Sequence, residues 1–314
     1  MTYFEFEKLF STDKDAIDYY IEKKYHGVLS CPHCHSKTRI YRYRNRTRYF
    51  QCKNCNNTFS VFNDTIFKKS RTSIRAWFFV IHLSLNAKKG VSACMIEREL
   101  KVSYKCAWRI LKQLRLAMGN PEFEESFKGI VEADETYIGG KSRRRYFRNY
   151  NKPDPSDDVK KYQGRGTIKT PVVGIRERDS GNVYAQVMFR NEKGQKLSGP
   201  QLLVVLKKVC KGKTKVMTDD YAGYNILDNE AASQFTHFSV NHSKCEYSAG
   251  NGIHTNGIEN FWSLLKRCHY GTYHYISVKY LQQYVNEACF RYNNRKNDNI
   301  FDVLLKQSVF KKPA

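Results

Sequence analysis

The sequence predicts a mixed α/β protein in which a sheet flanked by helices follows a small cysteine-bearing module and a helical region. Three observations support this class: two Cys-x-x-Cys pairs early in the chain, helical periodicity over residues 74–118, and short runs rich in Val, Ile and Thr that alternate with helical segments beyond residue 121. The 314 residues include 41% hydrophobic residues, enough for about two domains with cores of their own.

The individual elements follow from local patterns. A leading helix is expected over 13–26, where acidic and apolar residues alternate at helical spacing. The run Gly119-Asn120-Pro121 ends the helical region and marks a domain boundary. Beyond it, we expect strands at 129–133, 171–175, 183–189, 215–218 and 237–240, and helices at 199–210, 257–268 and 278–293.

The charge balance favours a polyanionic partner. Lys and Arg number 54 against 30 Asp and Glu, a formal net charge of +24, and basic side chains bind phosphates with release of counterions. Residues 141–169 hold ten of these cations, so we expect a mobile basic loop there, with Arg143, Arg144 and Arg145 as candidate DNA contacts. No apolar run reaches the roughly 18 residues of a membrane span, and no signal-peptide pattern opens the chain, so we expect a cytoplasmic protein with no membrane partner.

Four cysteines form a candidate zinc site. The pairs Cys31/Cys34 and Cys52/Cys55 are separated by 17 residues, the spacing of a four-cysteine ribbon that binds one structural Zn²⁺ tetrahedrally. A metal-free pair of turns or a disulfide is the alternative. The segment 39–50 between the pairs alternates basic and aromatic residues, and its arginines either bind phosphate or form a solvated face.

The helical region has helix–turn–helix character. Ser92 and Ser103 are good N-cap residues immediately before two periodic segments. Packing of the apolar faces would leave polar residues exposed on the second helix, of the types that contact base edges and phosphates in the major groove. These candidate DNA-binding residues are Tyr104, Lys105, Arg109 and Lys112.

Three acids stand out as candidate metal ligands. Asp134 and Asp219 each close an apolar run that reads as a buried strand, and Glu259 lies on a helical segment. Carboxylates at strand ends facing a helix-borne Glu can hold two Mg²⁺ ions that promote phosphoryl transfer. Lys266, two helical turns beyond Glu259, is a candidate to neutralise a phosphate.

Neighbouring acids compete for these roles. Strand alternation puts Glu132 on the same face as Asp134, and Glu135 and Asp220 adjoin the two selected aspartates. Surface carboxylates are common, so spacing alone does not choose among these residues. His254, five residues before Glu259, either contacts a scissile phosphate or has a structural role, capping the helix or packing against it.

Three motifs in order resemble the DDE transposases of zinc-ribbon insertion sequences, the group related to the eukaryotic Merlin transposons. They are Val131-Glu-Ala-Asp134-Glu-Thr-Tyr-Ile-Gly-Gly-Lys141, Thr218-Asp219-Asp-Tyr-Ala-Gly-Tyr224 and His254-Thr-Asn-Gly-Ile-Glu259-Asn-Phe-Trp-Ser-Leu-Leu-Lys266. The resemblance implies an RNase-H-like catalytic domain and assigns Asp134, Asp219 and Glu259 as the metal-binding triad. It favours the first two over their acidic neighbours. Some relatives carry Asn or His at the third position, whereas this chain keeps Glu.

These expectations combine into one organisation. Residues 1–70 would form a helix and zinc ribbon, 71–120 a helix–turn–helix, and 121–314 the RNase-H-like catalytic domain with the basic insert 141–169. The expected function is a DNA transposase that binds terminal inverted repeats in double-stranded DNA, using two Mg²⁺ (or Mn²⁺) per active site and acting as a homodimer or higher oligomer. The alternatives are a DNA-binding regulator derived from a transposase and a structure-specific nuclease.

Overall fold

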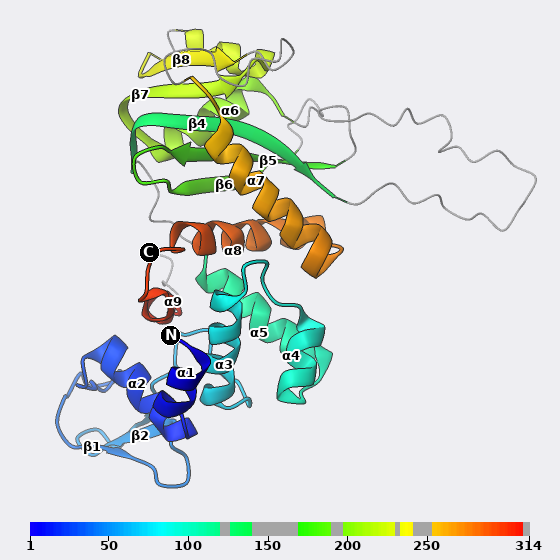
Figure 1. Ribbon diagram of the computed structural model, residues 1–314. Coiled ribbons are helices and arrows are strands. Elements are labelled where there is room, and N and C mark those ends of the chain that lie inside the picture. Colours follow the sequence, from blue (N-terminus) through cyan, green and yellow to red (C-terminus); the bar gives the residue numbers. More distant parts are fainter. Residues whose placement is uncertain (120–125, 140–168, 190–196, 230–232, 241–252, 310–314) are drawn as a thin grey trace, which may run out of the picture. The chain divides into compact units, whose positions relative to one another are not determined.

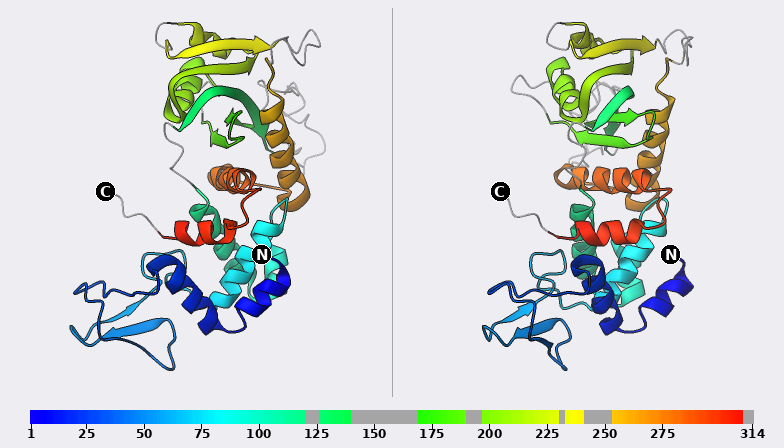
Figure 2. Two further views of the ribbon diagram at one scale, coloured as in Figure 1. Left: turned by 60° about the vertical axis from the view of Figure 1, so that its left-hand side comes forward. Right: turned by 90° about the vertical axis from the view of Figure 1, so that its left-hand side faces the viewer.

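The computed structural model describes residues 1–119, 126–139, 169–189, 197–229, 233–240 and 253–309 (Figures 1 and 2). The chain forms two compact units, one of Met1–Gly119 with Asn294–Ala314 and the other of Asn120–Asn293. No helix in these described ranges combines the length and apolar character that crossing a bilayer requires.

The first unit combines a small sheet with a set of helices. Its antiparallel sheet has the order β1-β2-β3, with β1 at Ile40–Arg42, β2 at Tyr49–Cys52 and β3 at Thr58–Ser60. The helices are α1 (Tyr3–Leu9), α2 (Asp13–Tyr25), α3 (Ile74–Asn86), α4 (Ala93–Leu100), α5 (Tyr104–Ala117) and α9 (Ile300–Gln307). Capping boxes at Thr2 and Thr12 start α1 and α2, because each threonine accepts from the amide of the third helical residue, whose carboxylate accepts from the threonine amide.

Aromatic side chains hold this unit together. Phe301 of α9 stacks on Phe10 at 5.8 Å between ring centroids and meets Phe78 of α3 edge-on at 5.4 Å. Asp302, next along α9, accepts a hydrogen bond from Tyr19 and pairs with Lys23 of α2, both at 2.6 Å. Burial and edge-to-face geometry of this kind make aromatic rings effective core residues. The C-terminal helix is therefore part of the first unit's core.

The second unit is a five-stranded mixed sheet with the order β6-β5-β4-β7-β8. Strands β4, β5 and β6 pair antiparallel, whereas β7 and β8 run parallel to β4. The strands are β4 (Phe127–Ile138), β5 (Thr170–Glu177), β6 (Val183–Val187), β7 (Cys210–Asp219) and β8 (Phe235–Val240). The helical elements are α6 (Gly199–Val209), α7 (Asn256–Cys268), α8 (Leu281–Asn293), the 3₁₀ turns η2 (Ala222–Asp228) and η6 (Val278–Tyr280), and the π-helical turn η5 (His269–Tyr273).

Helices cover both faces of this sheet. On one face α6 and η2 pack against Val131, Ala133 and their neighbours, and on the other α7 and α8 pack against Val172, Val183 and theirs. Strand alternation therefore sends odd-numbered residues of β4 toward η2 and even-numbered residues toward α7. The arrangement confirms the predicted α/β class and agrees with the RNase-H-like domain that the resemblance implies.

The observed elements follow the predicted ones closely, with two differences. Helices α1 and α9 are not among the expected elements, and both are short, with seven and eight residues. The compact units also differ from the predicted division at 121–314, since Asn294–Ala314 belongs to the first unit. The reason is the aromatic packing of Phe301, which the sequence alone does not pair with a residue almost 300 positions earlier. The functional division at residues 70/71 and 120/121 stays a prediction.

Candidate active site and metal centre

The pairing of β4 with β7 brings two aspartates to adjacent positions. The last registered pair between these parallel strands is Glu132 with Met217. Two residues further on, the strands carry Asp134 and Asp219, which therefore lie side by side on the same face. Asp219 ends β7, as the sequence predicts, but Asp134 does not end β4, which continues to Ile138 in its pairing with β5.

A third carboxylate joins this pair. Ligand oxygens of Asp134, Glu135 and Asp219 all lie within 4.8 Å of one another, and each side chain is half-buried. Glu135 approaches from the η2 face, where the buried Tyr224 hydroxyl donates to its Oε2 at 3.4 Å. Strand alternation puts Asp134 and Glu135 on opposite faces of β4. It therefore does not predict that the oxygens of both lie close to Asp219, as the structure shows.

This cluster makes ionisation costly. Burial, together with the charges of Glu135, Asp219 and Glu259, raises the pKa of Asp134 to about 8. Carboxylates that repel one another in a partly dry site are relieved by a divalent cation, for which carboxylate oxygens are the preferred ligands. The charge and the oxygen ligands of this group therefore suit a divalent cation such as Mg²⁺ or Mn²⁺.

Glu259 lies near this group without belonging to it. It is exposed in the first turn of α7, and the Thr255 hydroxyl donates to its Oε1 at 2.9 Å. Its charge is close enough to contribute to the raised pKa of Asp134, although Glu259 is not one of the three residues whose ligand oxygens all lie within 4.8 Å of one another. Lys266 is exposed in the last turn of the same helix, about 10 Å further along the axis at 1.5 Å per residue.

Asp134 is oriented by a tryptophan from α7. Trp262 is buried, and its indole Nε1 donates to Asp134 Oδ2 at 3.0 Å, while the Glu135 amide donates to Oδ1 at 2.8 Å. Gly174 of β5 pairs with Asp134 of β4, and because glycine has no side chain, the indole fills the space above it. A Cβ at residue 174 would lie 2.5 Å from Trp262 Cζ2 and 3.0 Å from Ile258 Cδ1. Nothing in the sequence spacing of Trp262 signals a hydrogen bond to a strand residue 128 positions earlier.

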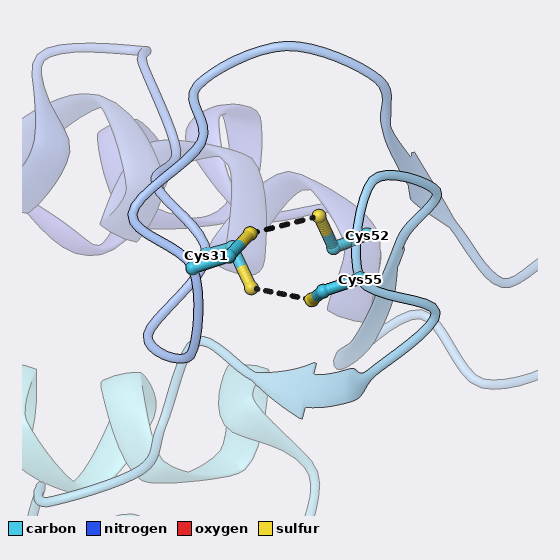
Figure 3. A group of neighbouring side chains, drawn as sticks. Cys31, Cys52 and Cys55 are labelled. Carbon is cyan, nitrogen blue, oxygen red and sulfur yellow. Dashed lines mark hydrogen bonds between the residues drawn. The ribbon is translucent and has the colours of Figure 1, made fainter.

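The four predicted zinc ligands converge in the first unit. Sγ of Cys31 lies 3.6 Å from Sγ of Cys55, and Sγ of Cys34 lies 3.6 Å from Sγ of Cys52 (Figure 3). Tetrahedral Zn–S bonds of about 2.3 Å imply sulfur–sulfur distances of about 3.8 Å, so the set fits one zinc ion. The Asn57 backbone amide lowers the pKa of Cys55 to about 6, which favours the thiolate that zinc binds. None of the described cysteines forms a disulfide.

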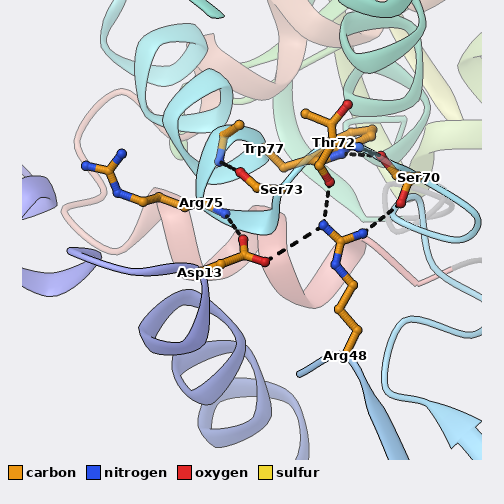
Figure 4. Close-up of polar contacts among 8 residues, drawn as sticks. Asp13, Arg48, Ser70, Thr72, Ser73, Arg75 and Trp77 are labelled. Atoms are coloured by element: carbon orange, nitrogen blue, oxygen red, sulfur yellow. Dashed lines mark hydrogen bonds and ion pairs between the residues drawn. The ribbon is translucent and has the colours of Figure 1, made fainter. Parts of the chain in front are cut away.

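Two arginines of the ribbon serve the fold of the first unit. Arg48 donates to the carbonyl oxygens of Ser70 at 2.7 Å and Thr72 at 2.5 Å and approaches Asp13 at 3.9 Å (Figure 4). Arg42 pairs with Asp18 of α2, and its guanidinium lies over the Phe50 ring. The sequence leaves open whether the ribbon arginines bind phosphate or form a solvated face. For Arg42 and Arg48 the structure shows a third role, since both side chains join the ribbon to neighbouring segments.

The helix–turn–helix prediction rests on α4 and α5. Ser92 accepts from the Met95 amide at 3.2 Å and Ser103 from the Cys106 amide at 3.3 Å, so both act as the N-caps that the sequence predicts. The turn between the helices passes through Lys101 in a left-handed conformation.

The predicted DNA-binding residues lie on α5. Tyr104, Lys105 and Arg109 are exposed, whereas Lys112 is partly covered, with its ammonium 5.3 Å from the Trp108 ring centroid. Arg109 also donates to the Lys68 carbonyl oxygen at 3.4 Å. The other three predicted contacts, Arg143, Arg144 and Arg145, lie outside the described residues.

Comparison with known proteins identifies the family. Residues 126–293 match the ISXO2-like transposase domain, and residues 11–58 match the transposase zinc-ribbon domain. The chain belongs to the ISXO2-like transposase family. The matched region contains both strand aspartates, Glu135 and all of α7, and the ribbon match contains the four zinc ligands.

Individual relatives agree with this assignment. An uncharacterized protein in the transposable element ISH50 of Halobacterium salinarum is 27% identical over 267 residues, covering 83% of this chain and 84% of that protein. An uncharacterized transposase-like protein of Haemophilus influenzae is 34% identical over 108 residues, covering 34% of this chain and 82% of that protein. Among solved structures, the Mos1 transposase paired-end complex with the left transposon end aligns with 74% of this chain and 80% of that chain, at 9% identity and a TM-score of 0.27, which carries no weight.

The contact between Gly174 and Trp262 yields a stability prediction. Gly174→Ala places a methyl group against the rigid indole, so we expect a loss of about 2 kcal/mol in the free energy of unfolding, as in other overpacked cores. Trp262→Phe removes the conflicting atoms. In a double-mutant cycle measured by chemical denaturation, the two substitutions should therefore couple by about 1 kcal/mol or more. Strictly additive costs would contradict the packing described.

Zinc binding yields a second prediction. The purified chain should hold one zinc ion per polypeptide, and Cys52→Ser should lose it because a four-thiolate site with one ligand removed binds far more weakly. Cys94→Ser is the matched control, since Cys94 is exposed and lies outside the cluster. Metal content measured by mass spectrometry decides the matter. Retention of zinc in Cys52→Ser, or its loss in Cys94→Ser, would refute the ligand assignment.

Proposed function

We propose that this transposase binds the terminal inverted repeats of an insertion sequence as double-stranded DNA, cleaves the element's 3′ ends and joins them to target DNA. One observation carries the catalytic part: oxygens of Asp134, Glu135 and Asp219 gather within 4.8 Å at neighbouring positions of two parallel strands. The family match over residues 126–293 supports the same reading.

The chemistry requires divalent metal ions, and the residues present suit them. Asp134, Asp219 and Glu259 would hold two Mg²⁺ or Mn²⁺ ions, with Glu135 close by. Such ions, when bound, activate the attacking oxygen and stabilise the leaving oxygen on phosphorus. The indole of Trp262 holds Asp134 in one orientation, and Lys266 would neutralise a phosphate of the bound strand.

The reaction consists of two balanced exchanges at phosphorus. In cleavage, the oxygen of water bonds to phosphorus while the bond to the 3′ oxygen breaks, and the proton lost by water appears on the 3′-hydroxyl. In strand transfer, that hydroxyl attacks a phosphodiester of the target and a target 3′ oxygen leaves. One phosphodiester replaces another, so no covalent protein–DNA intermediate is needed.

Recognition of the element ends is assigned to the first unit. Tyr104, Lys105, Arg109 and Lys112 lie on the second helix of the α4–α5 pair, the helix that enters the major groove in helix–turn–helix proteins. The net charge of +24 supports phosphate contacts, to which Arg143, Arg144 and Arg145 would add. Joining two element ends requires at least two protomers on DNA, so we expect a dimer or higher assembly, acting on DNA in the cytoplasm of a prokaryote.

The catalytic assignment predicts a difference between adjacent aspartates. Asp219→Asn removes a metal ligand and should lower cleavage of an inverted-repeat duplex with Mg²⁺ by about two orders of magnitude or more. Asp220→Asn is the matched control, because Asp220 is exposed and lies outside the carboxylate cluster. Single-turnover cleavage on labelled duplexes measures both.

Three results would overturn parts of this proposal. Unchanged cleavage by Asp219→Asn would refute the metal-ligand assignment. Cleavage by the wild-type protein without joining to target DNA would indicate a nuclease instead. Specific binding without cleavage in either Mg²⁺ or Mn²⁺ would indicate a regulator.

A further inference from the structure

A buried carboxylate next to the candidate active site has no assigned role. Glu132 lies in β4, two residues before Asp134 and on the same face of the strand, and its side chain is fully buried. A buried charge is tolerated only when it is paired and hydrogen-bonded. Arg178 Nε donates to its Oε1 at 2.9 Å, and Arg176 Nη1 lies 3.5 Å from the same oxygen.

The other oxygen of Glu132 binds the start of α7. The Ile258 backbone amide donates to Oε2 at 2.9 Å. Ile258 is the third residue of this helix, and its amide is one that an N-cap side chain ordinarily satisfies. Thr255 occupies the N-cap position but makes no side-chain capping bond, and its hydroxyl donates instead to Glu259. A carboxylate from the sheet thus replaces the missing cap and faces the positive end of the helix dipole.

The segment before α7 joins the same network. Arg178 Nη2 donates to the His254 carbonyl oxygen at 2.6 Å, and His254 Nδ1 lies 3.5 Å from Glu132 Oε1. The His254 ring thus packs beside the buried carboxylate, and packing is one of the roles that the sequence leaves open for this residue. Glu132 therefore contacts residues on both sides of the helix start.

The approach of the helix to this carboxylate is close enough to require glycine. A Cβ on Gly257 would lie 2.5 Å from Glu132 Oε2 and would also collide with the Arg176 guanidinium. Glu132 is buried, Arg176 is largely covered, and the two are paired with each other, so neither side chain can move aside freely. The Glu132 carboxylate therefore lies directly against the backbone of the first turn of α7.

We propose that Glu132 is a positioning residue that anchors the N-terminus of α7 to β4 and so presents Glu259 to the carboxylates of Asp134 and Asp219. The structural half of this proposal stands on the contacts above, and its consequence for metal binding rests on the proposed function. Glu259 directly follows Ile258, whose amide is anchored. A second link, from Trp262 to Asp134, lies one helical turn further on. Loss of the first link frees the turn that carries Glu259.

The three tryptophans provide a direct readout. Trp77 and Trp108 lie in the first unit and Trp262 lies beside Asp134, so 5-fluorotryptophan labelling yields three ¹⁹F resonances, with Trp262→Phe assigning the third. Glu132→Gln should shift or broaden the Trp262 resonance in the metal-free protein and leave the other two unchanged. On titration with Mn²⁺, whose unpaired electrons broaden nearby resonances, the half-saturating concentration should rise about tenfold or more, as for other groups that orient metal ligands.

Two further variants make the test decisive. Glu287→Gln is the matched control, because Glu287 is also buried and paired with arginine, at 3.8 Å from Arg291, but lies on α8; it should leave the Trp262 resonance and the Mn²⁺ midpoint unchanged. Gly257→Ala keeps the carboxylate and should displace the helix as Glu132→Gln does, which covers the case in which Glu132→Gln fails to fold.

The outcomes separate this proposal from the proposed function. An unchanged Trp262 resonance in Glu132→Gln or in Gly257→Ala would overturn the anchor. An equal change in Glu287→Gln would reduce Glu132 to a general stability role and overturn it as well. If the wild-type protein neither cleaves DNA nor responds to Mn²⁺, the proposed function fails, whereas the metal-free Trp262 resonance still decides whether Glu132 positions α7.

Discussion

The candidate site depends on how α7 is fixed to the strand beside it. Two polar links join them: Glu132 accepts from the Ile258 amide, and Asp134 accepts from the Trp262 indole. Glu132 and Asp134 are two strand residues apart, about 6.8 Å, and Ile258 and Trp262 are four helix residues apart, about 6 Å. The spacing of the two links along the strand therefore matches their spacing along the helix. A helix held at two matched points cannot slide or rotate without breaking one of them. The relative position of Asp134 and Glu259, which come from different elements, follows from this match.

This rigidity matters because the site gathers charges that repel. Asp134, Glu135 and Asp219 share a small volume, and the raised pKa of Asp134 expresses the cost of ionising it there. A loosely held cluster would relieve the repulsion by moving apart. Strands β4 and β7 prevent that movement through their ladder of hydrogen bonds, and the Gly174–Trp262 contact prevents it on the helix side. The fold thereby maintains an arrangement whose repulsion a divalent cation would relieve.

Much of this organisation could be predicted from the sequence, since hydrophobic patterns report local structure well. The five strands, the three helices of the second unit, the zinc ligands and the serine N-caps follow from local spacing. The position of Asn294–Ala314 could not be predicted, because it depends on the packing of Phe301 against residues distant in the chain. The roles of Glu135, Trp262 and Glu132 were also inaccessible. Each depends on strand register or on a hydrogen bond between distant segments, and such contacts produce no periodic pattern in the sequence.

The central claim is that Asp134, Asp219 and Glu259 hold divalent cations together. Anomalous diffraction from crystals soaked in Mn²⁺ tests it most directly, because the scattering locates the metal independently of the protein atoms. The account predicts anomalous peaks whose ligands include one oxygen each from Asp134 and Asp219, with Glu259 turned from Thr255 to complete the coordination. A Mn²⁺ concentration that supports DNA cleavage but gives no peak between the two aspartates would contradict the account.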